Sequence, residues 1–195
     1  FAIGLPHSGG AGLAALFEAN GYKWDHHKSG KLAQDLAYAQ ATGTMPFVGR
    51  ESVVGFSDIY RMHKRHLPPL AVQDYLAFLL HQFPDAYFVN TRRDVADWIA
   101  DRFWAEDGEH RIAAAWHAGI GEADLPQHWM TEDTQHESIC KDVFKGHARF
   151  LIFNISSEPI ETITKFFSED FNLNASFAPL SLEVSADDID AVVTE

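Results

Sequence analysis

The chain has 195 residues, of which 46% are hydrophobic and 22% are charged, which fits one globular domain and excludes a chain that is disordered throughout. Its formal net charge of -13 excludes the broad basic surface that nucleic acid or an anionic membrane requires, so we expect neither as a partner. The one cysteine, Cys140, cannot form an internal disulfide. No run approaches the ~20 apolar residues of a transmembrane helix, so a cytoplasmic protein is expected.

The first half of the chain alternates predicted strands and helices. Phe1–Leu5 is an apolar run that predicts a buried strand, and the glycines after it predict a tight loop. A helix is expected at Leu13–Asn20 and a short strand at Tyr22–Asp25. The composition of Lys31–Thr42 favours a second helix, and Phe47–Phe56 is typical of turn and strand.

The second half continues this alternation. Apolar residues recur at helical spacing in Val72–Gln82, and the apolar, aromatic run Ala86–Thr91 predicts a buried strand. Val95–Ala105 is expected to be helical, and the Ala-, Trp- and His-rich stretch Gly108–Lys145 predicts two or three further helices. The last predicted elements are a strand at Arg149–Ile155 and a helix at Glu158–Phe167.

The order of these elements predicts an α/β fold. Strands that alternate with helices favour a mainly parallel central sheet covered on both faces, which is a three-layer α/β/α arrangement. Ligands of such sheets bind at the carboxyl ends of the strands. We expect a single α/β domain over 1–182, with a helical cap over 104–147, and an acidic C-terminal segment over 183–195.

The loop Gly4–Gly12 has the clearest functional signal. Its glycines allow several backbone N–H groups to converge on an anion, and the helix that follows adds its positive N-terminal end. The first two glycines match the start of the P-loop pattern G-x-x-x-x-G-K-[ST], but Gly10 and Ala11 stand where Lys and Ser/Thr belong. The missing lysine and hydroxyl argue against an enzyme that hydrolyses ATP or GTP. A structural turn between strand and helix is the alternative interpretation of these glycines.

Three segments resemble the sulfotransferases that use 3′-phosphoadenosine 5′-phosphosulfate (PAPS). Phe1–Gly9, with Leu13 after it, resembles the start of that family and its loop Pro-Lys/Arg-Ser/Thr-Gly-Thr-Thr-Ser-Leu. Phe83–Asp94, followed by Trp98, resembles the strand that ends in an Arg-Asp pair and opens a helix, and Phe150–Ile155 resembles a late strand. The resemblance implies a P-loop-like sulfotransferase architecture with PAPS as cofactor and the helical cap on the acceptor side.

The resemblance also implies roles for individual residues. The loop would hold the phosphosulfate, and Arg93, with Arg92 as its neighbour, would hold the 3′-phosphate, which suits a bidentate cation at a strand end. Asp101 stands where the family has a serine, and its carboxylate would repel a phosphate. Each departure from the family removes a donor or a positive charge, at roughly 1.5–3 kcal/mol for a hydrogen bond to a charged group. The implied cofactor residues are Pro6, His7, Ser8, Gly9, Gly10, Ala11, Gly12, Arg92, Arg93 and Asp101.

Sulfuryl transfer needs a base for the acceptor's proton and a cation near the leaving phosphate oxygen. His7 stands at the family's basic loop position and is placed for the second role if it is protonated. His66 lies in Lys-Arg-His-Leu-Pro, which resembles the Lys-Thr-His-Leu-Pro around the catalytic histidine of cytosolic members. Asp58 follows a predicted strand and resembles an acidic position of bacterial members. The candidate bases are His26, His27, Asp58 and His66.

Two further groups of side chains are of types that could form a ligand site. The 11 histidines lack the spacings of zinc sites, so no metal is expected. The tryptophans of the cap region either line an apolar acceptor pocket or belong to the core, and they are Trp104, Trp116 and Trp129.

The sequence therefore predicts transfer of a sulfuryl group from PAPS to a hydroxyl group of a small-molecule acceptor. The departures at His7, Gly10, Ala11 and Asp101 favour an alternative, a catalytically inactive binding module with the same fold. A nucleotide or nucleoside kinase is a third interpretation, against which the missing Lys and Ser/Thr speak. Neither the acceptor nor the oligomeric state follows from the sequence.

Overall fold

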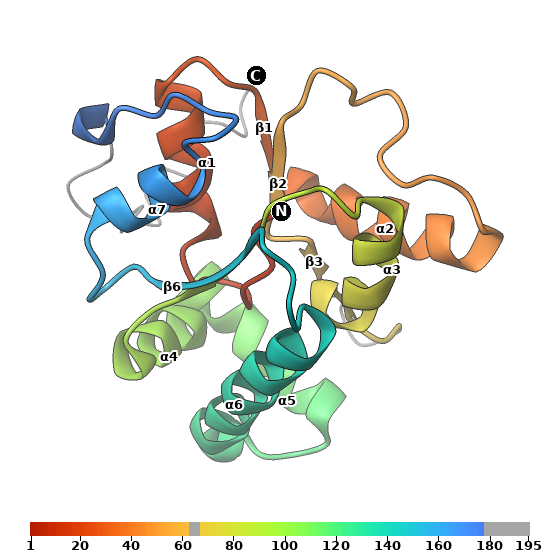
Figure 1. Cartoon of the computed structure of the whole chain (residues 1–195). Coiled ribbons are helices and arrows are strands. Elements are labelled where there is room, and N and C mark those ends of the chain that lie inside the picture. The colour runs from red at the N-terminus through yellow and green to blue at the C-terminus, as the bar shows by residue number, and fades with distance from the viewer. Residues whose placement is uncertain (63–66, 178–195) are drawn as a thin grey trace.

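The expected mixed α/β composition is confirmed by a computed structural model that describes residues 1–62 and 67–177 (Figure 1). The helices are α1 (Gly10–Ala19), α2 (Lys31–Thr42), α3 (Leu76–Gln82), α4 (Val95–Trp104), α5 (Glu109–Ala118), α6 (Leu125–Val143) and α7 (Ile160–Phe166). The strands are β1 (Trp24–His26), β2 (Gly55–Ser57), β3 (Tyr60–Arg61), β4 (Leu70–Ala71), β5 (Phe88–Arg92) and β6 (Phe150–Asn154). The predicted segment 183–195 and the candidate His66 lie outside the described residues.

The strands pair in small sheets, two of which are parallel. β1 pairs with β2 and β5 pairs with β6 in parallel ladders, whereas β3 and β4 form a short antiparallel ladder that the sequence did not predict. Backbone bonds of the first residues connect the two parallel pairs. The Ala2 N–H donates to the Phe56 carbonyl (2.9 Å), and the Ile3 N–H donates to the Val89 carbonyl (2.8 Å). The order across these strands is therefore β1, β2, residues 1–3, β5, β6.

The predicted strand Phe1–Leu5 is shorter than expected. Its backbone forms a β-bridge only at Ala2, opposite Val89. The chain turns away immediately afterwards, because Gly4 begins the loop and the Ser8 N–H donates back to the Leu5 carbonyl (3.1 Å). β2 is likewise short, since it contains only the last two residues of the predicted turn and strand Phe47–Phe56 and the serine that follows them.

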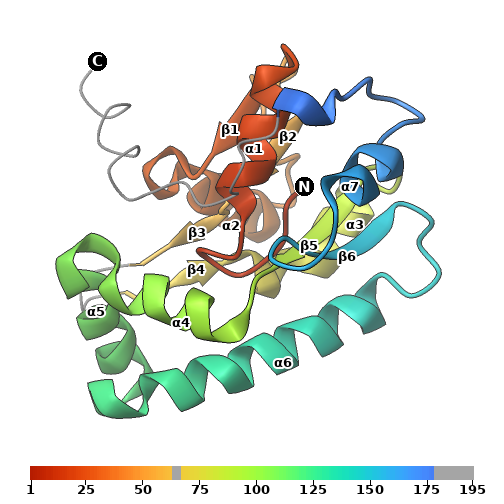
Figure 2. The ribbon, with the colours of Figure 1, turned by 90° about the vertical axis from the view of Figure 1, so that its left-hand side faces the viewer.

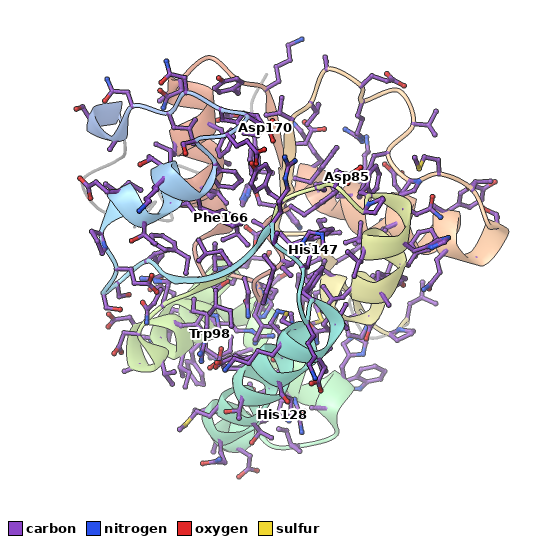
Figure 3. All side chains as sticks on the ribbon, in the orientation of Figure 1. Asp85, Trp98, His128, His147, Phe166 and Asp170 are labelled. Carbon is purple, nitrogen blue, oxygen red and sulfur yellow. The ribbon has the colours of Figure 1, made fainter. Side chains whose placement is uncertain are left out.

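Helices α4, α5 and α6 form a separate layer at the end of the molecule to which the loop Gly4–Gly12 projects (Figure 2). Trp98 on α4 and Trp129 on α6 are buried with Leu5 in one apolar cluster of this α4–α6 layer (Figure 3). The prediction of helices within 104–147 is thus confirmed, and the expected position on an acceptor side stays a prediction. Within residues 1–62 and 67–177 no helix has the length and apolar composition to cross a membrane.

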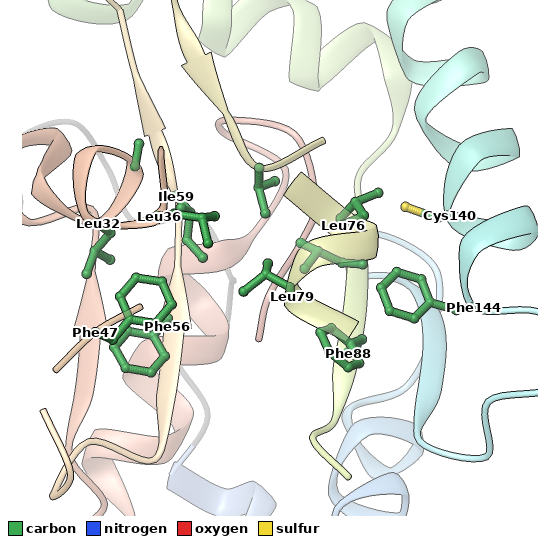
Figure 4. Close-up of a cluster of buried hydrophobic side chains, with 13 residues drawn as sticks. Leu32, Leu36, Phe47, Phe56, Ile59, Leu76, Leu79, Phe88, Cys140 and Phe144 are labelled. Carbon is green, nitrogen blue, oxygen red and sulfur yellow. The ribbon is translucent and has the colours of Figure 1, made fainter. Parts of the chain in front are cut away.

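Two further cores lie on opposite faces of the strands, because successive strand residues point to opposite sides. Ile3 and Phe88 belong to the core formed with α2, α3 and the end of α6 (Figure 4). Ala2 and Val89 belong to the core formed with α1 and α7. The loop that follows Ile3 starts between β2 and β5, to which Ala2 and Ile3 donate backbone hydrogen bonds.

Candidate functional site

The loop Gly4–Gly12 runs from the first strand segment to α1 and lies at the carboxyl end of β5. The buried Ser8 hydroxyl lies 3.1 Å from the Thr91 hydroxyl, which fixes the loop to that strand. The indole N–H of Trp98 donates to the Pro6 carbonyl (2.8 Å) from the other side. The loop is thereby fixed between a strand end and the α4–α6 layer.

Backbone donors converge where the loop enters α1. Gly9 is the N-cap residue of α1, with φ 112°, a conformation that favours glycine. No side chain caps this helix. The first turn of a helix has N–H groups without partners inside the helix, and here they belong to Gly10, Ala11 and Gly12. These donors and the helix dipole are the groups that could bind a small anion.

The ends of β1 and β2 bring two further predicted residues to the same edge. His27 directly follows β1 and Asp58 directly follows β2. Both have positive φ, 49° and 47°, and so does His7 at 65°. Such backbone conformations are uncommon for residues other than glycine and cluster at functional sites. Of the four predicted catalytic residues, the three within the described residues therefore share one edge and one kind of backbone strain.

His26 and Asp58 form a carboxylate–imidazole pair at this edge. The His26 Nδ1 atom lies 3.1 Å from Asp58 Oδ2 and 2.9 Å from the Ser57 hydroxyl. The Trp24 indole N–H donates to the same hydroxyl (2.9 Å). A proton on Nδ1 satisfies the carboxylate, so the Nε2 atom of neutral His26 keeps the lone pair of a base.

Asp58 also places a negative charge at the start of α1. A Cβ atom built on Gly10 would lie only 2.9 Å from Asp58 Oδ2. The carboxylate is therefore in contact with the first turn of the helix, where the helix dipole stabilises negative charge. The chain supplies an anion of its own beside the predicted anion-binding loop.

The two predicted arginines each pair with carboxylates. Arg93 forms an ion pair with Asp101, and its Nη1 atom lies 3.5 Å from the His7 carbonyl oxygen. Arg92 forms ion pairs with Asp133 and Glu137 of α6. The carboxylate of Asp101, which we expected to repel a phosphate, is thus the partner of Arg93.

The His7 ring is poorly suited to be a cation at this edge. Burial lowers the pKa of His7 below its ordinary value of 6.5, the charge of Asp58 opposes this change, and the charge of Arg102 adds to it. Burial also lowers the pKa of His27. Both rings are therefore neutral at pH 7, where each can donate one hydrogen bond and accept one.

Sequence reasoning assigned no role to Arg102. Its side chain is buried behind the loop, where its guanidinium stacks on Trp98 and Trp129. Its Nε–H donates to His110 Nε2 (3.3 Å), and the His110 ring contacts that of His7 (5.7 Å between centroids). The only feature of the sequence that could have indicated a contact between Arg102 and Trp98 is their spacing by one helical turn. The same spacing is equally typical of a solvated helix face.

Other candidates lie away from this edge. Trp129 is buried in the core, whereas Trp104 and Trp116 are exposed on the outside of the α4–α6 layer. Burial raises the pKa of the Cys140 thiol to about 12, which makes it a poor nucleophile.

In residues 1–62 and 67–177 no three His, Cys, Asp or Glu side chains are grouped as metal ligands. An open hollow of about 740 Å³ lies along α7 and includes none of the loop residues.

Comparison with known proteins adds no assignment. No family model matches the chain, and no curated protein matches it. The function is therefore inferred from the geometry of the loop and of the strand ends.

Proposed function

We propose that the chain binds PAPS at this edge and transfers the sulfuryl group to a hydroxyl group of a small-molecule acceptor. The observation that supports it most is the strand order β1, β2, residues 1–3, β5, β6, with Gly4–Gly12 at the carboxyl end of the middle segment. The connection after residues 1–3 leads to β1 on one side of that segment, whereas the connection after the neighbouring β2 leads to β5 on the other side, and ligands of parallel sheets bind at such a point. The proposal includes a three-layer, P-loop-like sulfotransferase architecture.

Most of the groups that fit the phosphosulfate end of PAPS are backbone N–H groups, and few of them are side chains. The first-turn N–H groups of α1 and the Ser8 hydroxyl would hold it, and Arg93 would hold the 3′-phosphate once Asp101 is displaced. PAPS supplies an activated sulfuryl group when bound. His26, oriented by Asp58, would accept the acceptor's hydroxyl proton on its Nε2 atom.

Isothermal titration calorimetry with adenosine 3′,5′-bisphosphate tests the proposal. Binding at submillimolar concentration is expected, because the ligand keeps both phosphates that the loop and Arg93 would contact. Absence of heat at millimolar ligand would exclude the cofactor assignment. ATP with Mg²⁺ is the control, and turnover of ATP would favour the kinase interpretation instead.

Replacement of Asp101 by serine is expected to tighten binding of adenosine 3′,5′-bisphosphate by about tenfold, because Arg93 loses its competing carboxylate and a negative charge leaves the site. Asp97→Ser is the matched control, since Asp97 is an exposed residue one turn earlier on α4. An equal gain in both variants would mean that only the net charge matters. An unchanged affinity of Asp101→Ser would contradict the role of Arg93.

A catalytically inactive binding module is the second candidate function, and a specific observation favours it. A carboxylate of the chain lies at each of the two places where an anionic group of the ligand would bind. Asp58 contacts the start of α1, and Asp101 pairs with Arg93. Under this proposal the native chain binds adenosine 3′,5′-bisphosphate weakly or not at all, and the double variant His7→Lys with Asp101→Ser gains affinity. Threonine at position 10 is unsuitable for this test, because its Cβ would meet Asp58.

A further inference from the structure

Arg102 is a buried cation whose guanidinium pairs with a carboxylate. Its side chain is 3% exposed, and its Nη1 atom donates to Glu132 Oε2 (2.6 Å). The guanidinium lies 5.2 Å from the ring centre of Trp98 and 4.6 Å from that of Trp129. Removing a guanidinium from water is costly, so its retention here requires the ion pair, the stacking and a third contact.

The third contact of Arg102 is with His110, whose ring contacts His7 of the loop. The Arg102 Nε–H donates to His110 Nε2, so that nitrogen accepts and the proton of neutral His110 is on Nδ1. Burial and the charge of Arg102 lower the pKa of His110 to about 3, so the ring is uncharged at neutral pH. The His110 ring lies edge-on to His7. Trp98, on which Arg102 stacks, donates to the carbonyl of Pro6.

We propose that Arg102 is a positioning residue of the anion site, which gives the loop a fixed positive charge that the neutral His7 ring does not supply. The inference rests on the proposed function and names the part of the ligand concerned, a phosphoryl or sulfuryl anion at Gly9–Gly12. Arg102 acts through His110 and does not touch the ligand. A charge in this buried layer is screened much less than one on the surface, so it acts across the intervening ring.

Glu132 partly neutralises Arg102, so the positive charge near the loop can be raised as well as lowered by substitution. Arg102→Met removes the positive charge, whereas Glu132→Gln removes its counter-charge and keeps the shape of the side chain. Arg111→Met is the matched control. Arg111 also stacks on an aromatic ring, that of Phe103 (4.9 Å), and pairs with one glutamate, Glu122 (2.7 Å).

The first measurement is the NMR titration of the His7 ring without ligand. Arg102→Met is expected to raise the pKa of His7, Glu132→Gln to lower it, and Arg111→Met to leave it unchanged. A purely structural role for Arg102 predicts no opposite response of the two variants. An unchanged His7 titration in both folded variants of the Arg102–Glu132 pair would overturn the proposal.

The second measurement is calorimetry with adenosine 3′,5′-bisphosphate. Arg102→Met is expected to weaken binding by about tenfold and Glu132→Gln to tighten it severalfold. If Arg102→Met does not fold, Glu132→Gln decides, since tighter binding supports the proposal and equal or weaker binding contradicts it. If the native chain binds no ligand while the His7 titrations respond as expected, the proposed function fails and the action of Arg102 on the loop stands.

Discussion

Replacement of Gly4 by alanine is expected to lower the free energy of unfolding by about 3 kcal/mol. A Cβ atom at this position would lie 2.3 Å from the Ser8 hydroxyl oxygen and 2.4 Å from both the carbonyl and the hydroxyl oxygen of Thr91. The carbonyl belongs to β5 and cannot move without disturbing the ladder with β6. Urea denaturation followed by circular dichroism measures the loss, as a lower midpoint at an unchanged slope.

Gly121→Ala is the control for this substitution. Gly121 has φ -73°, which alanine adopts without strain, and a Cβ atom there would meet only Asp124 Oδ2, at 3.3 Å. We expect its effect to stay within about 1 kcal/mol. Equal stability of the two variants would mean that the loop does not approach β5 as closely as the distances require. The comparison thus tests the packing of the loop independently of any ligand.

The order of elements could be predicted because buried strands are short apolar runs and helices repeat their apolar residues every three or four positions. Ala86–Thr91 and Arg149–Ile155 were identified in this way and contain most of β5 and all of β6. The two-residue strands β3 and β4 could not be found, because so few residues show no period. Residues 62–69 separate them, and 63–66 of these lie outside the described residues.

The edge of the site could also be predicted, whereas its ion pairs could not. His27 and Asp58 follow strands, and strand ends meet at one edge of a parallel sheet, so sequence position alone brings them near the loop. The pairing of Arg93 with Asp101 depends on how α4 leaves β5, and the pairing of Arg92 depends on the position of α6. No local pattern determines these tertiary contacts, so the neutralisation of both arginines was not foreseen.

Acidification from pH 6.5 is expected to destabilise the protein steeply. Burial lowers the pKa values of four histidines, which are His7, His27, His110 and His136. The unfolded chain therefore binds more protons than the folded one below pH 6.5, so stability is full above that pH and falls as the pH falls. For His110, with a pKa of about 3 in the folded protein, the loss is about 2 kcal/mol at pH 5.

His110→Gln separates this contribution from those of the other histidines. Glutamine offers an oxygen acceptor for the Arg102 Nε–H but takes up no proton, so the decline of the unfolding free energy between pH 6.5 and 5 should become shallower. His128→Gln is the control, because it makes the same exchange at an exposed position of α6 (Figure 3). Parallel curves for native protein and His110→Gln would show that His110 is not held neutral by burial.

The same titration bears on the loop, because protonated His7 supplies a positive charge next to the first turn of α1. An anion bound there favours the protonated ring and raises the pKa of His7 toward that of the unfolded chain. Acid destabilisation should then be weaker in millimolar adenosine 3′,5′-bisphosphate than in chloride at equal ionic strength. Identical acid unfolding in both solutions would mean that the loop does not bind the anion, even though its backbone has the geometry for one.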